Sequence, residues 1–150
     1  LYELKHLPRT KELARICPDL KHVSDYAIVD NKSYRLMHRL LPGPYTFILR
    51  ATKLVPKIFL NHRRTIGIRV PDQLIARHLA EQLGHPLVTT TASDPEAGQL
   101  LEDAGRIAEK FGHAIDYIID VGVVLHSLST IVSLLDEPEV IREGKGEIPV

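Results

Sequence analysis

Basic and hydroxyl side chains recur in the segment 63–71, Arg-Arg-Thr-Ile-Gly-Ile-Arg-Val-Pro. Side chains alternate between the two faces of a strand, so Thr65, Gly67 and Arg69 share one face and the apolar residues between them share the other. A face that is both small and cationic is unusual for a core strand and suits an anion pocket. An ordinary surface strand remains the alternative interpretation.

A second polar stretch, Thr89-Thr90-Thr91-Ala92-Ser93, ends a strand of the buried type that we expect over residues 86–91. Ligands of open α/β sheets bind at the carboxyl ends of strands. Hydroxyl and backbone N–H groups there can donate to phosphate or carboxylate oxygens. Threonine repeats are also simply good strand formers, so this stretch alone is weak evidence of a site.

Several other kinds of site are excluded or disfavoured. The one cysteine, Cys17, rules out a disulfide scaffold and an all-cysteine metal site. The eight histidines never form an H-E-x-x-H or H-x-H spacing, so we expect no structural metal. The sequence has no Walker A, G-x-G-x-x-G or G-x-S-x-G motif, which leaves Rossmann and hydrolase-elbow interpretations without support.

The formal net charge of zero conceals an asymmetry. Residues 1–71 contain 14 Lys or Arg and 5 Asp or Glu, a net charge of +9, and the rest of the chain carries −9. Such asymmetry indicates an anion-facing surface in the first half, unless the two halves interleave and their charges mix. No apolar run approaches the roughly 20 residues of a membrane span, and we expect a cytoplasmic protein with no membrane partner.

Strands alternate with helices along the chain, which predicts an α/β domain with a mixed or parallel sheet, a single domain over 1–150. We expect strands at 13–17, 45–51, 65–70, 86–91, 116–120, 130–135 and 140–142, and helices at 31–41, 56–60, 72–83 and 100–111. Leu1, Leu4 and Leu7 recur at helical spacing, so the sequence is expected to begin inside a helix.

Taken in order, six motifs resemble the YrdC/YciO family over nearly the whole chain, from Leu4 to about Gly144. The most specific, as a pair, are Pro42-Gly43-Pro44-x-Thr46-x-Ile48-Leu49 and the strand Thr65-Ile-Gly-Ile-Arg69-Val-Pro71. The others are Leu4-Lys5, Thr90-Thr91-Ala92-Ser93, Ser129-Thr130-Ile131-Val132 and Arg142-Glu143-Gly144.

The resemblance implies a YrdC-like twisted mixed sheet flanked by helices. It also implies the reaction of the family's characterised enzymes, the threonylcarbamoyl-AMP synthases. These nucleotidyltransferases condense L-threonine, bicarbonate and ATP, release pyrophosphate and supply the t6A modification of tRNA. ATP is then a substrate, accompanied by Mg²⁺, and no structural metal is implied.

The resemblance also implies roles for seven residues and assigns no catalytic residue. The nucleotide-binding positions are Lys5, Thr65, Ser93 and Arg142; the substrate-binding positions are Arg69, which pairs with the amino-acid carboxylate, Thr91 and Ser129.

Three departures from the family pattern point to the YciO branch. Leu7 stands where the family's Lys-x-Arg has arginine, Thr91-Ala92-Ser93 replaces Ser-x-Asn, and Ser133 replaces an aspartate. The family's N-terminal strand and its Pro-Thr-Asp-Thr segment have no counterpart in the sequence. We therefore expect the N-terminal part of the fold to be missing and the site to be incomplete.

Two other functions stay open. One is a non-catalytic module that binds double-stranded RNA, tRNA or the ribosome through the basic surface expected for the first half of the chain. Aromatic residues make up only 5% of the sequence and include no tryptophan, so base stacking is poorly supported. The other is a degenerate fold kept for protein–protein contact. The oligomeric state is left open.

Overall fold

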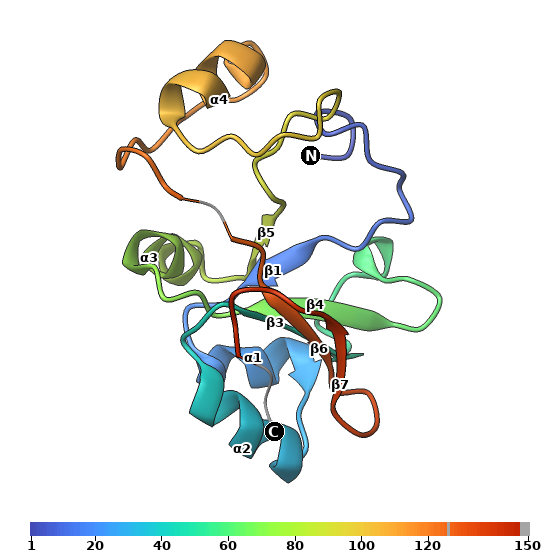
Figure 1. Cartoon of the computed structure of the whole chain (residues 1–150). Helices are drawn as coiled ribbons and strands as arrows, with labels where there is room; N and C mark the ends of the chain where they lie inside the picture. Colours follow the sequence, from blue (N-terminus) through green and yellow to red (C-terminus); the bar gives the residue numbers. More distant parts are fainter. Residues whose placement is uncertain (126, 148–150) are drawn as a thin grey trace. The chain divides into compact units, whose positions relative to one another are not determined.

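Seven strands form one mixed sheet in the computed structural model, which describes residues 1–125 and 127–147 (Figure 1). The sheet order is β5-β1-β4-β3-β6-β7, with β2 paired to β3. β1 runs parallel to β4 and β3 parallel to β6, and the other pairs are antiparallel. The strands are β1 (Ala14–Ile16), β2 (Ala27–Ile28), β3 (Tyr45–Ala51), β4 (Thr65–Arg69), β5 (Leu87–Thr89), β6 (Thr130–Ser133) and β7 (Glu139–Arg142). The predicted mixed α/β sheet is confirmed.

The chain divides into two units. Unit 1 comprises Leu1–Lys11 and Thr90–Ser127, and unit 2 comprises Glu12–Thr89 and Leu128–Val150. The described helices are α1 (Leu20–Tyr26), α2 (Asn31–Leu40), α3 (Leu74–Leu83) and the single turn η1 (Lys57–Phe59) in unit 2, and α4 (Ala104–Phe111) in unit 1. Within the described ranges, no helix is both long and apolar enough to cross a membrane.

The core of unit 2 lies between α1, α2 and one face of the sheet (Figure 1). Phe47 of β3 pairs with Ile68 of β4, and both are fully buried. Val23 of α1 and Met37 of α2 pack in the same cluster. Because side chains alternate along a strand, the residues between these core positions point to the opposite face of the sheet. The two faces predicted for residues 65–70 are therefore present, and Arg69 lies on the face away from the core.

Helix α2 begins where the sequence predicts, at an Asp30 cap whose carboxylate accepts the N–H of Ser33 at 2.7 Å. This hydrogen bond holds the pKa of Asp30 below its ordinary value, and Lys32 adds to the effect. A depressed carboxyl pKa contributes stability that is complete above the ordinary aspartate pKa of about 3.9 and is lost as the pH falls through the folded-state value.

We therefore expect Asp30→Ala to lower the melting temperature by about 2–4 °C at pH 7, because a lost N-cap leaves helix donors unpaired. The difference from the wild type should shrink below pH 4. Calorimetry between pH 2.5 and 7 measures both effects, with Asp30→Asn as the control that keeps a neutral cap. An equal difference at every pH would show that the carboxylate charge plays no part.

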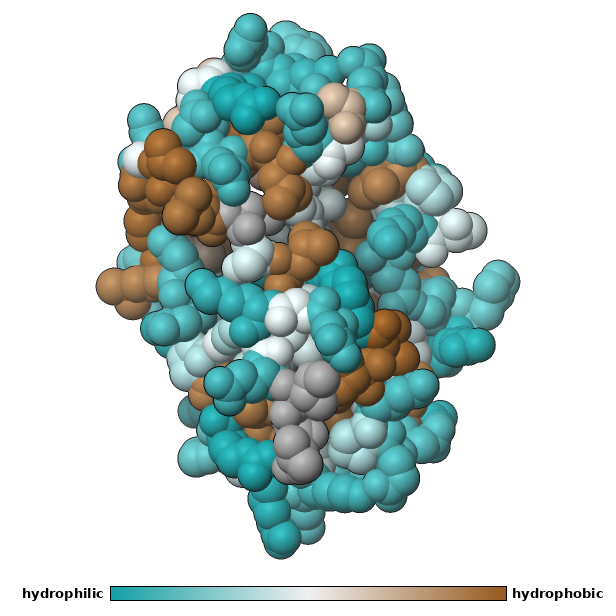
Figure 2. Space-filling model, in the orientation of Figure 1, coloured by the Kyte–Doolittle hydropathy of each residue, from teal (hydrophilic) through white to brown (hydrophobic). Residues whose placement is uncertain are grey.

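The apolar side chains that helical spacing places along one face of α3, Leu74, Ile75, Leu79 and Leu83, are not buried. Leu74 is 73% exposed and Leu83 48% exposed, and the one buried residue of this helix is Ala80. The helix ends at Gly84, which has a left-handed φ of 71°, as the sequence predicts. Figure 2 shows apolar side chains at the surface in several groups among hydrophilic ones.

Two predicted elements are wrong, and the predicted start of a third is wrong. Residues 116–120 form no strand, because they pair with no neighbouring strand in the described ranges and β propensity alone does not supply a hydrogen-bonded ladder. Residues 2–6 form turns instead of a helix, and α4 starts after the Asp103 cap instead of at Leu100. Helix α1 and strand β2 are present although neither was predicted.

Cys17 is fully buried after β1. Burial raises the pKa of its thiol to about 12, with Asp19 and Asp25 adding to the rise. Since the thiolate is the reactive form, alkylation of the folded protein at pH 8 should be roughly a thousandfold slower than that of an unperturbed thiol. Labelling with iodoacetamide, followed by mass spectrometry with and without denaturant, tests this. Rapid labelling of the folded chain would contradict it.

Candidate functional site

The Pro-Gly-Pro motif joins two strand ends in unit 2. The N–H of Gly43 donates to the carbonyl of Val70, just after β4, at 2.9 Å. The N–H of Thr130, the first residue of β6, donates to the carbonyl of Pro44 at 3.0 Å. A side chain on Gly43 would meet the carbonyl of Leu40 at 2.3 Å, so only glycine fits there. The motif therefore fixes the start of β3 against the end of β4 and the start of β6.

Three polar side chains meet at this end of the sheet. The hydroxyls of Thr46 and Ser129 are 2.8 Å apart, and both residues are buried. The Arg142 guanidinium donates through Nη2 to the carbonyl of Ser129 at 2.8 Å and to its hydroxyl at 3.3 Å. Ser129 thus lies between Thr46 and Arg142, and the structure brings two of the predicted positions into direct contact.

The surroundings of Gly144 explain why the Arg142-Glu143-Gly144 motif ends in glycine. A Cβ on Gly144 would lie 2.3 Å from the carbonyl oxygen of Leu128 and 2.5 Å from the carbonyl carbon of Ser129. Its N–H donates to the Thr130 hydroxyl at 3.1 Å. The chain after Arg142 can therefore pass tightly against the backbone that carries Ser129 only if this residue is glycine.

Arg69 ends β4 at the same end of the sheet. It follows Ile68, which pairs with Phe47, and therefore comes level with Thr46 on the sheet face away from the core. Its Nε is buried and has no hydrogen-bond partner. Burial lowers the pKa of Arg69, and the positive charge of Arg142 lowers it further.

Arg69, Arg142, Ser129 and Thr46 together form what we call the arginine cluster. Within the described ranges, neither arginine forms an ion pair with a carboxylate. Two guanidinium groups that repel each other beside two hydroxyls and an unused Nε donor are arranged to receive an anion. A planar carboxylate or a phosphate matches this set of donors.

Thr65 is not brought to the arginine cluster. It lies at the opposite end of β4 from Arg69, a separation of about 13 Å at the usual rise per residue. Its hydroxyl donates to the Glu12 carboxylate at 2.8 Å and accepts from the Asn61 amide at 2.8 Å. The one donor of this hydroxyl and one of its two acceptor sites are thus used inside the protein.

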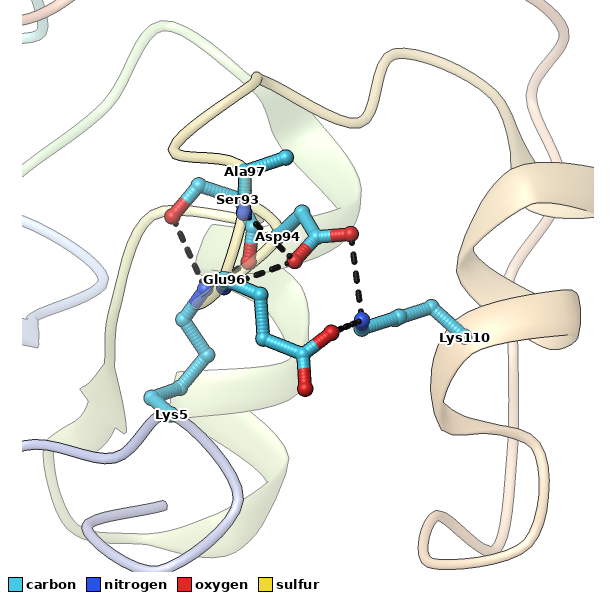
Figure 3. A network of polar contacts seen from close by, with 6 residues as sticks. All are labelled: Lys5, Ser93, Asp94, Glu96, Ala97 and Lys110. Carbon is cyan, nitrogen blue, oxygen red and sulfur yellow. Dashed lines mark hydrogen bonds and ion pairs between the residues drawn. The ribbon is translucent and has the colours of Figure 1, made fainter.

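In unit 1, two of the predicted nucleotide-binding positions, Lys5 and Ser93, lie together. Its Nζ donates to the backbone carbonyl of Ser93 and, at 2.8 Å, to the Ser93 hydroxyl (Figure 3). The ammonium also lies 5.5 Å from the ring centroid of Phe111, a cation–π distance. Burial lowers the pKa of Lys5, and the negative charge of Asp94 opposes part of the shift. The predicted Lys5 and Ser93 positions are therefore in direct contact.

Ser93 begins a tight turn that Asp94 holds together. The Asp94 carboxylate accepts the N–H groups of Glu96 at 2.8 Å and Ala97 at 3.1 Å, and these two bonds hold its pKa below the ordinary value (Figure 3). Thr91 lies two residues before Ser93, is half-buried, and makes no side-chain hydrogen bond within the described part of the chain.

Two functional candidates, Thr46 and Asp94, lie outside the predicted site positions. Thr46 belongs to the Pro-Gly-Pro-x-Thr motif, and its place as the first residue of β3 on the sheet face away from the core is a usable signal. Asp94 follows Ser93 directly and starts an Asp-Pro turn, which is a recognisable signature. No group of three or more His, Cys, Asp or Glu residues within the described ranges could hold a metal ion.

The chain is similar in sequence and in fold to known proteins. The chain is 38% identical over 147 residues to Escherichia coli YciO, covering 97% of this chain and 71% of YciO. The crystal structure of E. coli YciO matches with a TM-score of 0.89, over 97% of this chain and 72% of that one.

Two further relatives carry more specific names. A threonylcarbamoyl-AMP synthase from Idiomarina loihiensis is 35% identical over 124 residues, covering 80% of this chain and 66% of the enzyme. The crystal structure of P. abyssi Sua5 complexed with L-threonine is 26% identical with a TM-score of 0.85, covering 95% of this chain and 43% of that one.

The family model for Sua5, YciO and YrdC proteins, described as telomere recombination, matches residues 1–144. This range contains every motif that builds the arginine cluster and the Lys5–Ser93 contact, and the chain therefore belongs to the Sua5/YciO/YrdC family.

Proposed function

We propose that this chain binds ATP and L-threonine and acts as a threonylcarbamoyl-AMP synthase. The observation that carries the proposal is the arginine cluster, in which Arg69 and Arg142 have no carboxylate partner within the described ranges and the buried Arg69 Nε has no acceptor. An amino-acid carboxylate would supply that acceptor. The names of the Idiomarina enzyme and of the threonine complex support the choice of substrate.

The proposed chemistry joins anions. The threonine amine combines with bicarbonate to give a carbamate and water. A carbamate oxygen then attacks the α-phosphorus of ATP, forming a P–O bond while the bond to the β-phosphate oxygen breaks and pyrophosphate leaves. Fixed cations are needed because both partners are negatively charged. Arg69 holds the threonine carboxylate and Lys5 neutralises phosphate charge, while Mg²⁺ enters as part of the nucleotide substrate.

Isothermal titration with ATP, followed by a pyrophosphate-release assay with threonine and bicarbonate, tests the proposal. We expect ATP to bind, and pyrophosphate release to require both other substrates. ATP binding without release would reduce the function to nucleotide binding. Failure to bind ATP would overturn it.

Binding of double-stranded RNA is the second candidate, and charge distribution is the observation that favours it. Residues 31–71 contain nine Lys or Arg and no Asp or Glu. Arg63 and Arg64, which lie between η1 and β4, are exposed. If such a surface binds the phosphate backbone of RNA, the logarithm of the RNA affinity should fall linearly with the logarithm of the salt concentration. This affinity should survive Arg69→Ala. An affinity for double-stranded RNA that is absent, or that does not change with salt, would reject this candidate.

A further inference from the structure

The last two residues of α4 contact Lys5 and the turn that follows Ser93. Phe111 places its ring beside the Lys5 ammonium. The preceding residue, Lys110, reaches the turn that carries Ser93 (Figure 3). The Lys110 Nζ is 3.1 Å from the Asp94 carboxylate and 2.7 Å from the Glu96 carboxylate. None of the sequence motifs includes Lys110.

The two ion pairs of Lys110 differ in how strongly solvent screens them. The side chains of Lys110 and Asp94 are 29% and 20% exposed, whereas that of Glu96 is 72% exposed. The pair with Asp94 is therefore the better protected one. Asp94 is also the residue that folds the turn, since it accepts two backbone N–H groups.

The Asp94–Ala97 turn fixes Ser93, and Ser93 sets the direction of the Lys5 ammonium. An ammonium has three N–H donors, and two of them are directed at the backbone oxygen and hydroxyl of Ser93. One donor is left for a ligand, and its direction is fixed by where the two Ser93 oxygens lie. A shift of the turn by about 1 Å would misdirect that donor, and errors of this size are costly at binding sites.

We propose that Lys110 is a positioning residue, which holds the Asp94–Ala97 turn so that Ser93 directs the Lys5 ammonium towards a nucleotide phosphate. The inference rests on the proposed function, because it takes Lys5 to be a phosphate ligand. Lys110 itself touches no ligand in this account and acts only through Asp94, Glu96 and Ser93.

The test measures the dissociation constant for ATP by isothermal titration in the full chain. Lys110→Met should weaken ATP binding by about tenfold, whereas Lys110→Arg should restore most of the affinity. Lys11→Met is the matched control, since it removes one exposed lysine charge from the same unit and should change the affinity less than about twofold.

A double-mutant cycle with Lys5→Met separates positioning from a general loss of stability. If Lys110 acts through Lys5, Lys110→Met should have no further effect once Lys5 is methionine. Additive effects, or a Lys110→Met variant that matches Lys11→Met, would overturn the inference. Should Lys110→Met fail to fold, Glu96→Gln removes one of the two ion pairs at an exposed position and should give a smaller loss of the same kind.

The outcomes also separate this inference from the proposed function. A wild-type chain that does not bind ATP contradicts the proposed function. An ATP affinity that Lys5→Met leaves unchanged contradicts the phosphate role of Lys5, and with it the positioning role of Lys110, but not ATP binding itself. A wild-type chain that binds ATP through Lys5 but is indifferent to Lys110 contradicts the positioning role alone.

Discussion

Arg69→Met should reduce the affinity for L-threonine by roughly a hundredfold or more, and it should leave the ligand-free protein equally stable or more stable. The loss of affinity follows from removing the group that pairs with the carboxylate. Truncating one member of a buried, hydrogen-bonded charge pair typically costs about 2–5 kcal/mol. Few single substitutions in this chain should change binding more.

The gain in stability has a separate cause. Without ligand, the Arg69 guanidinium is desolvated, its Nε has no acceptor and Arg142 repels it. Methionine keeps most of the apolar stem and removes all three penalties. We expect the melting temperature to stay constant or to rise by about 2–4 °C.

Arg39→Met is the matched control for Arg69→Met. Arg39 is an exposed arginine on α2, the helix that packs against the opposite face of the sheet. It should change neither threonine affinity nor melting temperature appreciably. Threonine titration and differential scanning calorimetry on the three proteins measure both effects. A large fall in the stability of Arg69→Met would mean that Arg69 holds the fold together and is not reserved for a ligand.

The regular parts of unit 2 could be predicted from the sequence because local signals agree there with the packing. Residues 45–51 alternate apolar side chains at positions that face α1 and α2, and Asp30 and Gly84 mark helix ends by chemistry that acts within one turn. Helix α1 was also readable: Asp19 caps it, and Leu20 and Val23 follow at helical spacing.

The errors arise where structure depends on distant partners. Residues 116–120 have the composition of a strand, but a strand exists only with a neighbour to bond. The face of α3 that carries Leu74 and Leu83 has an amphipathic pattern, which says nothing about whether another element covers it.

The residues of the arginine cluster could be predicted from local motifs, but their meeting in the fold could not. The motifs identified Arg69, Ser129 and Arg142, but their meeting depends on the parallel register of β3 with β6, which no local pattern encodes. The motif that supplied Arg69 also supplied Thr65, which lies at the other end of the strand with its hydroxyl engaged by Glu12. Shared membership of one motif is therefore not evidence of a shared site.

Lys5→Met should weaken ATP binding by about 10–100-fold, the usual range for a lost hydrogen bond to a charged group. It should leave threonine affinity unchanged. Because burial lowers the pKa of Lys5, the ammonium loses its proton at a lower pH than an ordinary lysine does. ATP affinity of the wild type should therefore begin to fall with rising pH below the ordinary lysine pKa of about 10.4, and Lys5→Met should lack this decline.

Titration with ATP between pH 7 and 10 checks this prediction, with Lys11→Met as the control that keeps Lys5. The methionine variant retains the apolar stem beside Phe111, so the fold should persist and circular dichroism should match the wild type. If Lys5→Met binds ATP as tightly as the wild type, the ammonium contacts no phosphate.

The most direct test of the central claim, that the arginine cluster binds the substrate carboxylate, is the titration of L-threonine into wild-type protein and into Arg69→Met. The account predicts saturable binding to the wild type, with the affinity lost in Arg69→Met while the melting temperature is maintained or raised. Equal threonine affinities in the two proteins would contradict it.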